Sequence, residues 1–578
     1  MSYHPPIPSL PGKGPIPAWT ERVDALRRHG KEKKPDVLIV GSGPIGAVYA
    51  RTLAKKGVKV MMIDMGEQAS KRIGDHRKNS VAVQKDISLF TNVIRGELSP
   101  LSVPVSESDL SLDPVSWQKE PEKFVLNGQN PDQNRRYNLA ASAATRTVGG
   151  MSSHWTCCTP RQHLLERSTL FEENEWKKLY SEAETLFDTN DKVFDDSIHH
   201  RLVKNVVGTA IKDDKDRTVK SMPLACKRPS PSTTYIEWSC TATILGDLAG
   251  PDKKDPNFDM KPQWKCDTLH ITAPGGKGKV DGAIVVDLVK NEEWLVTAKK
   301  YVICAGAVLT AGIMAKSLLE SDMPMENSYP ALTMTFCQVV LKQQLVDDVG
   351  ENPGSLDIPG SDVIKRAVEE HKKRHPDDPL PFPFSDLDPQ VYLPFSEKYP
   401  WHTQIHRDAF GYGEVPKSLD QRLVVDLRWF GYTSESPDNM VTFHKTRRDG
   451  FGMPQPTFHF TVSKEDGERT HQMMQDMIKI ASSLGGFVPG AEPRYLAPGS
   501  ALHICGIYRA GKQKQGQPLE DIKKTSVVDR NGCVWGLNNL VLGGCGVIPK
   551  GNASNPTLTA ACFALAGAKQ ILKDLGKA

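Results

Sequence analysis

The sequence has little of what small disulfide-bonded scaffolds, zinc modules and nucleic-acid-binding proteins depend on. Its 578 residues include 11 cysteines, an odd number without a CxxC pair, and the closest two, Cys157 and Cys158, are adjacent. This argues against a disulfide framework and a zinc site, so no metal is expected. The 73 Lys and Arg residues nearly balance the 69 Asp and Glu residues, for a net charge of +4. Such a balance argues against nucleic acid as a partner.

Long hydrophobic runs are also missing. The best apolar stretches, Val37–Ala50 and Tyr301–Ala315, are interrupted by glycine and are shorter than the roughly 18–20 residues that span a membrane. The Pro-rich residues 1–19 lack the apolar segment of a secretory signal. We therefore expect no membrane partner and a cytoplasmic or other intracellular location, with reduced and mostly buried thiols.

The clearest motif that is present lies near the N-terminus. Residues 36–40 predict a buried parallel strand, which leads directly into the glycine-rich Gly41–Gly46. Apolar residues then recur at helical spacing up to Ala54, Gly57 lies where a helix C-cap is expected, and a second strand, residues 58–63, ends at Asp64. The order of strand, GxGxxG, helix, strand and acid predicts a Rossmann-like unit with a bound dinucleotide.

Each residue of this motif has a physical role in dinucleotide binding. We expect Gly41 to make the tight turn, Gly43 to let the backbone approach a pyrophosphate, and Gly46 to allow close packing of helix on strand. The helix N-terminus offers free N–H groups to the phosphates. Asp64 is placed to accept from a ribose hydroxyl, which disfavours the 2′-phosphate of NADP. The motif does not separate FAD from NAD.

A second informative run spans Thr145–Pro160. Gly149 and Gly150 permit close approach to a flat ligand, and His154 follows among small polar residues. By residue chemistry alone, a histidine such as His154 is more often structural than functional.

Five separated motifs, in the family's order, resemble those of the pyranose oxidases, a branch of the glucose–methanol–choline flavoprotein oxidoreductases. The resemblance covers almost the whole chain. It implies that FAD is the cofactor, linked covalently through its 8α-methyl group to His154, with Thr156 beside the reactive nitrogen N5. An NAD-dependent dehydrogenase would leave the His154 segment unexplained. The five motifs are Thr145–Pro160, Trp401–Gly413, Pro454–Phe458, Leu542–Pro549 and Asn555–Thr559.

Oxidation of an alcohol by hydride transfer needs a base for the hydroxyl proton and polar groups that orient the substrate. The chain has 16 histidines, so residue type alone selects none of them. The resemblance implies that His503 is the base and that Asn555 is its partner at the reacting hydroxyl. Without it, His503 would be read as a buried structural histidine, and Asn555 as a cap for the helix that Pro556 opens. The implied substrate-binding residues are Gln404, Asp408, Phe410, Tyr412 and Arg428.

The resemblance implies a sugar oxidase that converts D-glucose to its 2-keto form and passes the electrons to O2 or a quinone. The chain departs from the family at Gly411, at Tyr508–Gly511, in the polar insertion 512–518 and at Lys550–Asn552. These departures leave open a related glycoside or polyol substrate, oxidation at C3, and a quinone acceptor. A flavin-binding paralogue without turnover is a further alternative.

The implied fold combines α/β with α+β: an FAD-binding domain interleaved with a substrate-binding domain. The alternating residues of Arg422–Trp429 indicate an antiparallel sheet in the latter. Residues 97–117 are expected to form an oligomerisation arm and residues 350–389 a head insertion, which implies a homotetramer. The expected FAD-binding segments are 30–100, 140–165, 240–325 and 500–578, and the substrate-binding segments are 166–239 and 326–499.

Overall fold

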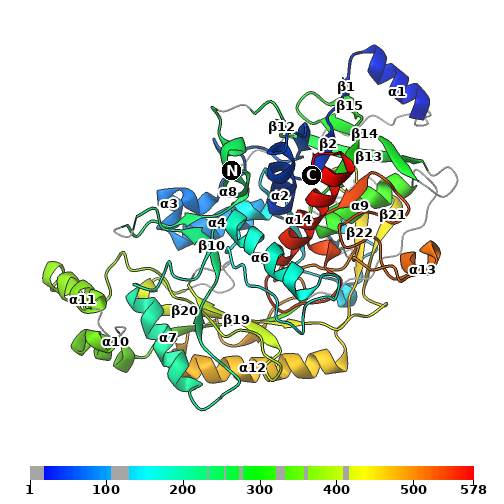
Figure 1. Ribbon diagram of the computed structural model, residues 1–578. Helices are drawn as coiled ribbons and strands as arrows, with labels where there is room; N and C mark the ends of the chain where they lie inside the picture. The colour runs from blue at the N-terminus through cyan, green and yellow to red at the C-terminus, as the bar shows by residue number, and fades with distance from the viewer. Residues whose placement is uncertain are drawn as a thin grey trace, which may run out of the picture.

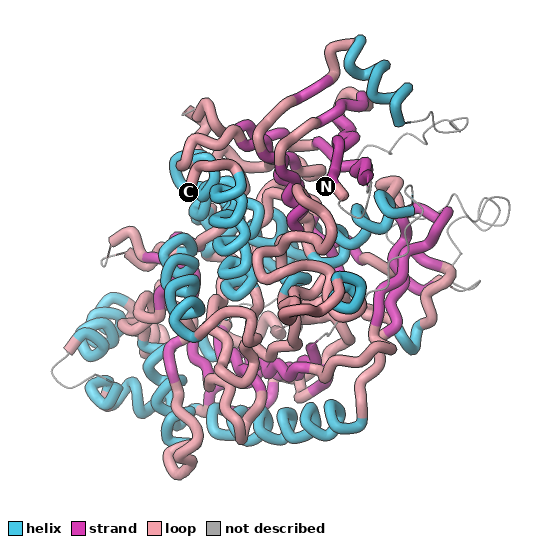
Figure 2. Tube along the Cα trace, turned by 45° about the vertical axis from the view of Figure 1, so that its right-hand side comes forward, coloured by secondary structure: helices cyan, strands magenta, loops and turns pink. Residues whose placement is uncertain are grey.

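Two large sheets organise the molecule, as the computed structural model shows (Figures 1 and 2). One is parallel and carries the glycine-rich motif, and the other is antiparallel. The structure describes residues 19–105, 129–230, 233–252, 255–272, 278–319, 332–356, 362–407 and 415–578.

The parallel sheet has five strands in the order β12, β3, β2, β16, β25, and every neighbouring pair is parallel. All residues of β2 and β3 are buried, as expected for parallel strands that are covered on both faces. The Rossmann-like prediction is therefore confirmed. The strands are β2 (Val37–Val40), β3 (Val60–Ile63), β12 (Phe258–Lys261), β16 (Lys300–Ile303) and β25 (Leu540–Leu542).

Helices α2 (Pro44–Ala54) and α14 (Thr557–Asp574) pack together on this sheet, with α6 (Glu173–Phe187) beside α14 and α8 (Thr241–Leu245) beside α2 (Figure 1). The approach of α14 to α2 is close, because a Cβ on Gly567 would lie 2.4 Å from the hydroxyl of Tyr49. Helix α2 ends at Ala54, the last residue of the predicted helical pattern. Its C-cap is Lys55, and Gly57 adopts a left-handed φ of +72° two residues later.

The antiparallel sheet has the strand order β23, β17, β20, β19, β18, β9, and β24 also pairs with β17. Its strands come from residues 220–495, and those of the parallel sheet from residues 37–63, 258–303 and 540–542. The domain boundaries themselves stay a prediction. The strands are β9 (Lys220–Ser221), β17 (Leu332–Leu341), β18 (Gln390–Tyr392), β19 (Trp401–His406), β20 (Val424–Tyr432), β23 (Gly485–Phe487) and β24 (Arg494–Tyr495).

The two faces of the antiparallel sheet differ in character, because successive side chains of a strand point to opposite sides. On one face, Trp401 and Trp429 donate their indole N–H groups to Asp476 of α12 (Lys464–Leu484), at 2.9 and 2.8 Å. Helix α12 runs along the lower edge of the molecule in Figure 1, and α7 (Ile198–Ala210) packs beside it. The other face is polar, and its β19 residues are His402, Gln404 and His406.

Smaller sheets and helices complete the fold. A four-stranded sheet packs against α1 and α9, and short strands begin the proposed arm, whose residues 106–117 lie outside the described part. The elements are α1 (Trp19–Arg28), β1 (Glu32–Lys33), α3 (Val81–Gln84), α4 (Ile87–Glu97), β4 (Leu98–Pro100), β5 (Val103–Pro104), β6 (Gln129–Asn130), β7 (Ala143–Thr145), β8 (Thr189–Asn190), β10 (Leu224–Lys227), β11 (Glu237–Trp238), β13 (Trp264–Thr272), β14 (Lys279–Asp287), β15 (Glu292–Val296), α9 (Ala307–Leu319), α10 (Gln343–Glu351), α11 (Val363–Arg374), β21 (Met440–Arg448), β22 (Pro454–His459) and α13 (Leu519–Lys523).

The segment predicted as a head insertion is anchored to the antiparallel half of the molecule. Ile364 and Val368 on α11 and Leu380 and Phe382 after it are buried in the same core cluster as α12. All eleven cysteines are free, and nine of them are buried. Within the described residues, no helix is long and apolar enough to cross a membrane.

Candidate active site

The glycine-rich turn between β2 and α2 shows which of its glycines serve the fold. Gly41 has a left-handed φ of +99°, and a Cβ there would lie 2.5 Å from the Cys304 carbonyl oxygen. A Cβ on Gly46 would lie 2.1 Å from the Gly41 carbonyl oxygen. Gly43 differs, because no described atom other than those of its chain neighbours lies within 4 Å of its Cβ position. The turn therefore leaves open space at Gly43, at the N-terminus of α2.

Asp64 at the end of β3 braces this turn. Its carboxylate accepts from the backbone N–H and the hydroxyl of Ser42, at 2.8 and 2.7 Å, and from the N–H of Gly66 at 2.8 Å. Burial raises the pKa of Asp64, and these hydrogen bonds oppose the rise. The Ser42 hydroxyl in turn accepts from the N–H of Gly149 at 2.8 Å. A Cβ on Gly150 would lie 3.4 Å from the Cα of Gly43, so the two predicted glycine motifs meet here.

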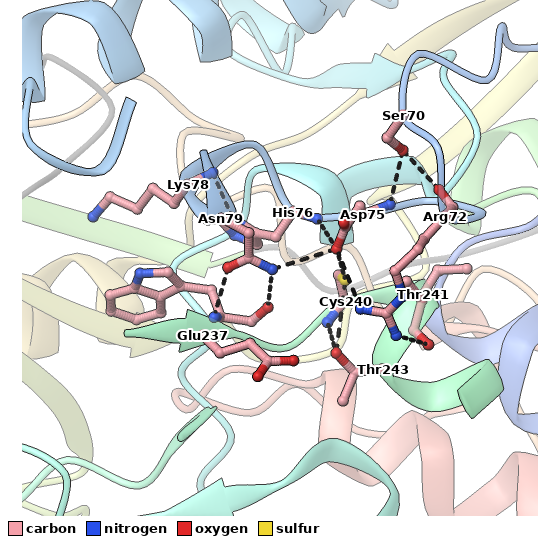
Figure 3. Close-up of polar contacts among 12 residues, drawn as sticks. Ser70, Arg72, Asp75, His76, Lys78, Asn79, Glu237, Cys240, Thr241 and Thr243 are labelled. Atoms are coloured by element: carbon pink, nitrogen blue, oxygen red, sulfur yellow. Dashed lines mark hydrogen bonds and ion pairs between the residues drawn. The ribbon is translucent and has the colours of Figure 1, made fainter. Parts of the chain in front are cut away.

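A network of polar contacts joins residues 70–79 to residues 237–243 (Figure 3). The Cys240 thiol donates to Asp75 at 3.6 Å, and Asn79 exchanges two hydrogen bonds with the backbone of Trp238. Thr241 donates its hydroxyl to the Ser42 carbonyl at 2.7 Å. The backbone N–H of Thr241 also donates to the Ser152 hydroxyl at 3.0 Å, so Thr241 links the Gly149 loop to the turn.

His154 follows this loop and is buried, with 1% of its surface exposed. Its Nε2 lies 2.9 Å from the Thr145 hydroxyl, and its Nδ1 is buried without a hydrogen-bond partner among the described residues. Burial lowers the pKa of His154 to about 4, so the ring is neutral at pH 7. Thr156 is partly buried, and Cys157 after it has a left-handed φ of +59°. Such a backbone angle is costly for a residue with a Cβ and is often found at functional sites.

The structure brings together three of the predicted site residues. Nδ2 of Asn555 lies 3.2 Å from Nε2 of His503, and the Gln404 amide donates to Oδ1 of Asn555 at 2.7 Å. Gln404 comes from the polar face of the antiparallel sheet, and Asn555 from the loop before α14. The site therefore lies where the two halves of the molecule meet. The alternative role of Asn555 as a helix cap is not observed, because the N-cap of α14 is Pro556 and has no side-chain hydrogen bond.

The environment of His503 sets its protonation state. Its ring stacks on Phe430, with centroids 5.8 Å apart, and its Nδ1 is buried without a hydrogen-bond partner among the described residues. Burial, assisted by the positive charge of Arg428, lowers the pKa of His503 to about 3. Leu502, directly before it, has a left-handed φ of +57°. The imidazole is therefore neutral at neutral pH, and it follows a residue in a sterically unfavourable backbone conformation.

Arg428 lies opposite Gln404 in the pairing of β19 and β20, and 2% of its surface is exposed. It donates to Nε2 of His406 at 2.8 Å, which requires that nitrogen to be unprotonated. Burial lowers the pKa of His406 well below its usual value, and the charge of Arg428 adds to this effect. The result is a fixed positive charge on the polar face.

The remaining predicted substrate residues, Asp408, Phe410 and Tyr412, lie outside the described residues. Sequence reasoning missed His402 and His406, which share the polar face with Gln404. It also missed Phe430, which stacks on His503. The signal was available in the alternating Trp-His-Thr-Gln-Ile-His of β19, where every second residue is polar and able to bind a substrate.

Comparisons with known proteins place this site in a family. An FAD binding domain model matches residues 34–81, and a GMC oxidoreductase model matches residues 435–564. Pyranose 2-oxidase of Emericella nidulans is 44% identical, over 96% of both chains. The chain belongs to the pyranose 2-oxidase family. Another pyranose 2-oxidase, from Lyophyllum shimeji, is 38% identical over 93% of this chain and 92% of its own.

The pyranose 2-oxidase family assignment agrees with the fold. A crystal structure of formate oxidase matches with a TM-score of 0.62 at 13% identity, over 94% of this chain and 99% of that chain. At such low identity the likeness concerns the fold alone. The protein is an FAD-dependent oxidoreductase, and the residues present fit that cofactor. The space at Gly43 suits a pyrophosphate, and the unpartnered Nδ1 of His154 shows that a polar atom has been left unsatisfied in the buried loop.

Proposed function

We propose that the protein oxidises an aldopyranose, with D-glucose as the expected substrate, at C2, and uses O2 as the electron acceptor. Two electrons and two protons pass from the sugar to oxygen, which gives a 2-keto sugar and H2O2. When bound, FAD supplies the acceptor for the hydride from the sugar carbon and returns the electrons to O2. The observation that carries the proposal is the contact between His503 and Asn555, in a chain that belongs to the pyranose 2-oxidase family.

In this reaction His503 takes the hydroxyl proton at Nε2, the ring atom that faces Asn555. With a pKa of about 3, the imidazole carries no proton on its acceptor nitrogen at neutral pH and can take one from the substrate, but it is a weak base. The charge of Arg428 reduces the basicity of His503. The same charge stabilises negative charge that develops on the sugar oxygen as its proton leaves.

The amides of Asn555 and Gln404 orient the reacting hydroxyl. They are hydrogen-bonded to each other at 2.7 Å, so their positions are coupled before any sugar binds. A polyhydroxylated substrate presents several similar hydroxyls, and choice among them depends on such fixed donors and acceptors. Asp408, Phe410 and Tyr412 are proposed to complete the sugar pocket.

We propose that His154 carries FAD covalently through the flavin 8α-methyl group, with Thr156 near N5. The neutral, buried ring of His154 supports this, since an unprotonated nitrogen is needed to form the bond. Thr145 fixes the orientation of the ring through Nε2. Asp64 is proposed to accept a hydrogen bond from a ribose hydroxyl, in addition to those that it accepts from Ser42 and Gly66.

The proposed assembly is a homotetramer, in which residues 97–117 act as an arm and residues 350–389 as a head. Within that head, Phe384 is 65% exposed and Val363 is 50% exposed, which suits a surface that meets another chain. Light scattering should give four times the chain mass of 63.8 kDa. A mass of one or two chains would contradict the tetramer and leave the chemistry untouched.

The proposed reaction is tested by its products. D-Glucose, a methyl glucoside, a C-glycoside and a polyol are each incubated with the protein in air, and the oxidised carbon is located by NMR. The proposal expects oxidation of D-glucose at C2 with one H2O2 formed per sugar. Oxidation at C3, or turnover only when a quinone is added, would favour the related activities. No product from any sugar with either acceptor would favour a flavin-binding protein without turnover.

A further inference from the structure

Asn555 lies in a buried loop that has no regular secondary structure. Residues 552–554 before it are at most 3% exposed, and the loop continues to the start of α14 at Thr557. Backbone N–H groups buried in this way need acceptors from elsewhere in the chain. What supplies those acceptors also fixes the position of Asn555.

Glu166 supplies one of them and also accepts from a side chain of the same loop. Its Oε1 accepts from the backbone N–H of Ala553 at 2.6 Å, and its Oε2 accepts from the Ser554 hydroxyl at 3.2 Å and from the N–H of His163 at 3.0 Å. The side chain points inward, since Glu166 is 5% exposed while the preceding Leu165 is 56% exposed. Among the described residues, no lysine, arginine or histidine forms an ion pair with it. Burial raises its pKa.

A buried carboxylate without a cationic partner is unfavourable for the fold by itself. Its hydrogen bonds go to neutral donors, and two of those donors lie in the loop that bears Asn555. Glu166 also follows His154 by twelve residues, in the segment that leaves the proposed flavin attachment. One carboxylate therefore ties the segment after His154 to the loop that carries Asn555.

We propose that Glu166 is a positioning residue that holds Asn555 in contact with His503. The expected effect on the rate of flavin reduction rests on the proposed function. The expected effect on the loop that carries Asn555 does not. Glu166 does not contact His503 or the reacting hydroxyl. It acts through residues 553–555.

Two variants test this, with Asp466→Asn as the matched control for Glu166→Gln. Asp466 is also buried and also accepts from one backbone N–H and one serine hydroxyl, both of Ser434, and it differs from Glu166 in forming an ion pair with Arg469. It belongs to α12, on the opposite face of the antiparallel sheet from Gln404. Both substitutions replace a buried carboxylate by an amide of the same shape. Because Asp466→Asn also removes the ion pair with Arg469, its loss of stability should be at least as large as that of Glu166→Gln, which makes it a stringent control for destabilisation.

Hydrogen exchange measured by mass spectrometry on the FAD-loaded protein gives the first readout. In Glu166→Gln, residues 551–555 should exchange at least about tenfold faster than in the wild type, and they should be unchanged in Asp466→Asn. Unchanged exchange in Glu166→Gln would overturn the proposal. This readout needs no sugar, so it decides the role of Glu166 even if the proposed reaction fails.

Anaerobic flavin reduction by D-glucose gives the second readout. Glu166→Gln should lower the saturating rate constant about 10- to 100-fold and change the apparent sugar affinity less than about threefold. When added to Asn555→Ala, it should change the rate by less than about twofold, because both substitutions remove the same positioned amide. Multiplicative losses, or a loss in Asp466→Asn as large as in Glu166→Gln, would show that Glu166 does not act through Asn555.

Discussion

Nε2 of His503 lies 3.2 Å from Nδ2 of Asn555, although the two residues are 52 positions apart in the chain. They come from separate loops, one after the left-handed Leu502 and the other before α14. Gln404 reaches this pair from the antiparallel sheet, so the contact joins the two halves of the molecule. The predictions below follow from this arrangement.

Substitution His503→Ala should lower the rate constant of anaerobic flavin reduction by sugar about 100-fold or more, the usual effect of losing a positioned base. The measurement is stopped-flow absorbance at saturating sugar. His200→Asn is the control, because His200 is also buried but contacts Ser221 and Gln390 of the antiparallel sheet. If the His503→Ala rate equals that of the wild type, another group is the base.

Substitutions in the glycine-rich turn should separate effects on folding from effects on cofactor binding. Gly46→Ala places a Cβ 2.1 Å from a backbone oxygen and should lower the yield of folded protein. Gly43→Ala meets no described atom within 4 Å outside its chain neighbours, so it should fold but bind FAD at least about tenfold more weakly. Melting temperature and flavin content of the purified variants measure the two effects. Full flavin content in Gly43→Ala would place the pyrophosphate elsewhere.

Denaturation reports on the proposed link to His154. Wild-type protein precipitated with acid should keep its yellow colour in the pellet, whereas His154→Ala should release all of its flavin into the supernatant. Thr145→Val is informative beside it, since it removes the hydroxyl that lies 2.9 Å from the His154 ring and should reduce the linked fraction. Free flavin from the wild-type protein would refute the covalent link.

The pH dependence of flavin reduction follows from the low pKa of His503. The group is neutral above its pKa of about 3 and becomes protonated below it. The proton acceptor is therefore lost when the pH is lowered and kept when the pH is raised. The reduction rate should therefore stay level as pH falls through 6.5, the ordinary pKa of histidine, and decline only as the pH approaches the His503 pKa of about 3. A decline centred near 6.5 would mean that bound sugar or flavin restores an ordinary pKa.

Particular residues show which features of the fold and the site could be predicted from the sequence. Residues 36–64 were predictable, because glycine spacing, apolar periodicity and the terminal acid all act locally. The partnership of His503 with Asn555 had no local signal and rested on the family resemblance. The polar face of β19 could have been found from its alternation, but not the fact that Phe430 on β20 stacks on His503.

Long-range contacts explain what the sequence could not show. Glu166 has no motif around it, and its role depends on a loop almost 400 residues later. Tyr508, which departs from the family pattern, donates its hydroxyl to the Gly543 carbonyl at 3.0 Å. A Cβ on Gly546 would lie 2.3 Å from its ring, so the glycine run near the C-terminus makes room for this tyrosine. Neither pairing follows from spacing.

Anaerobic mixing of the FAD-loaded protein with D-glucose tests the central claim most directly. The flavin absorbance near 450 nm should bleach fully with one equivalent of sugar and return when O2 is admitted, with the sugar recovered as its 2-keto form. A flavin that stays oxidised in excess D-glucose and in every other pyranose tried would contradict the account.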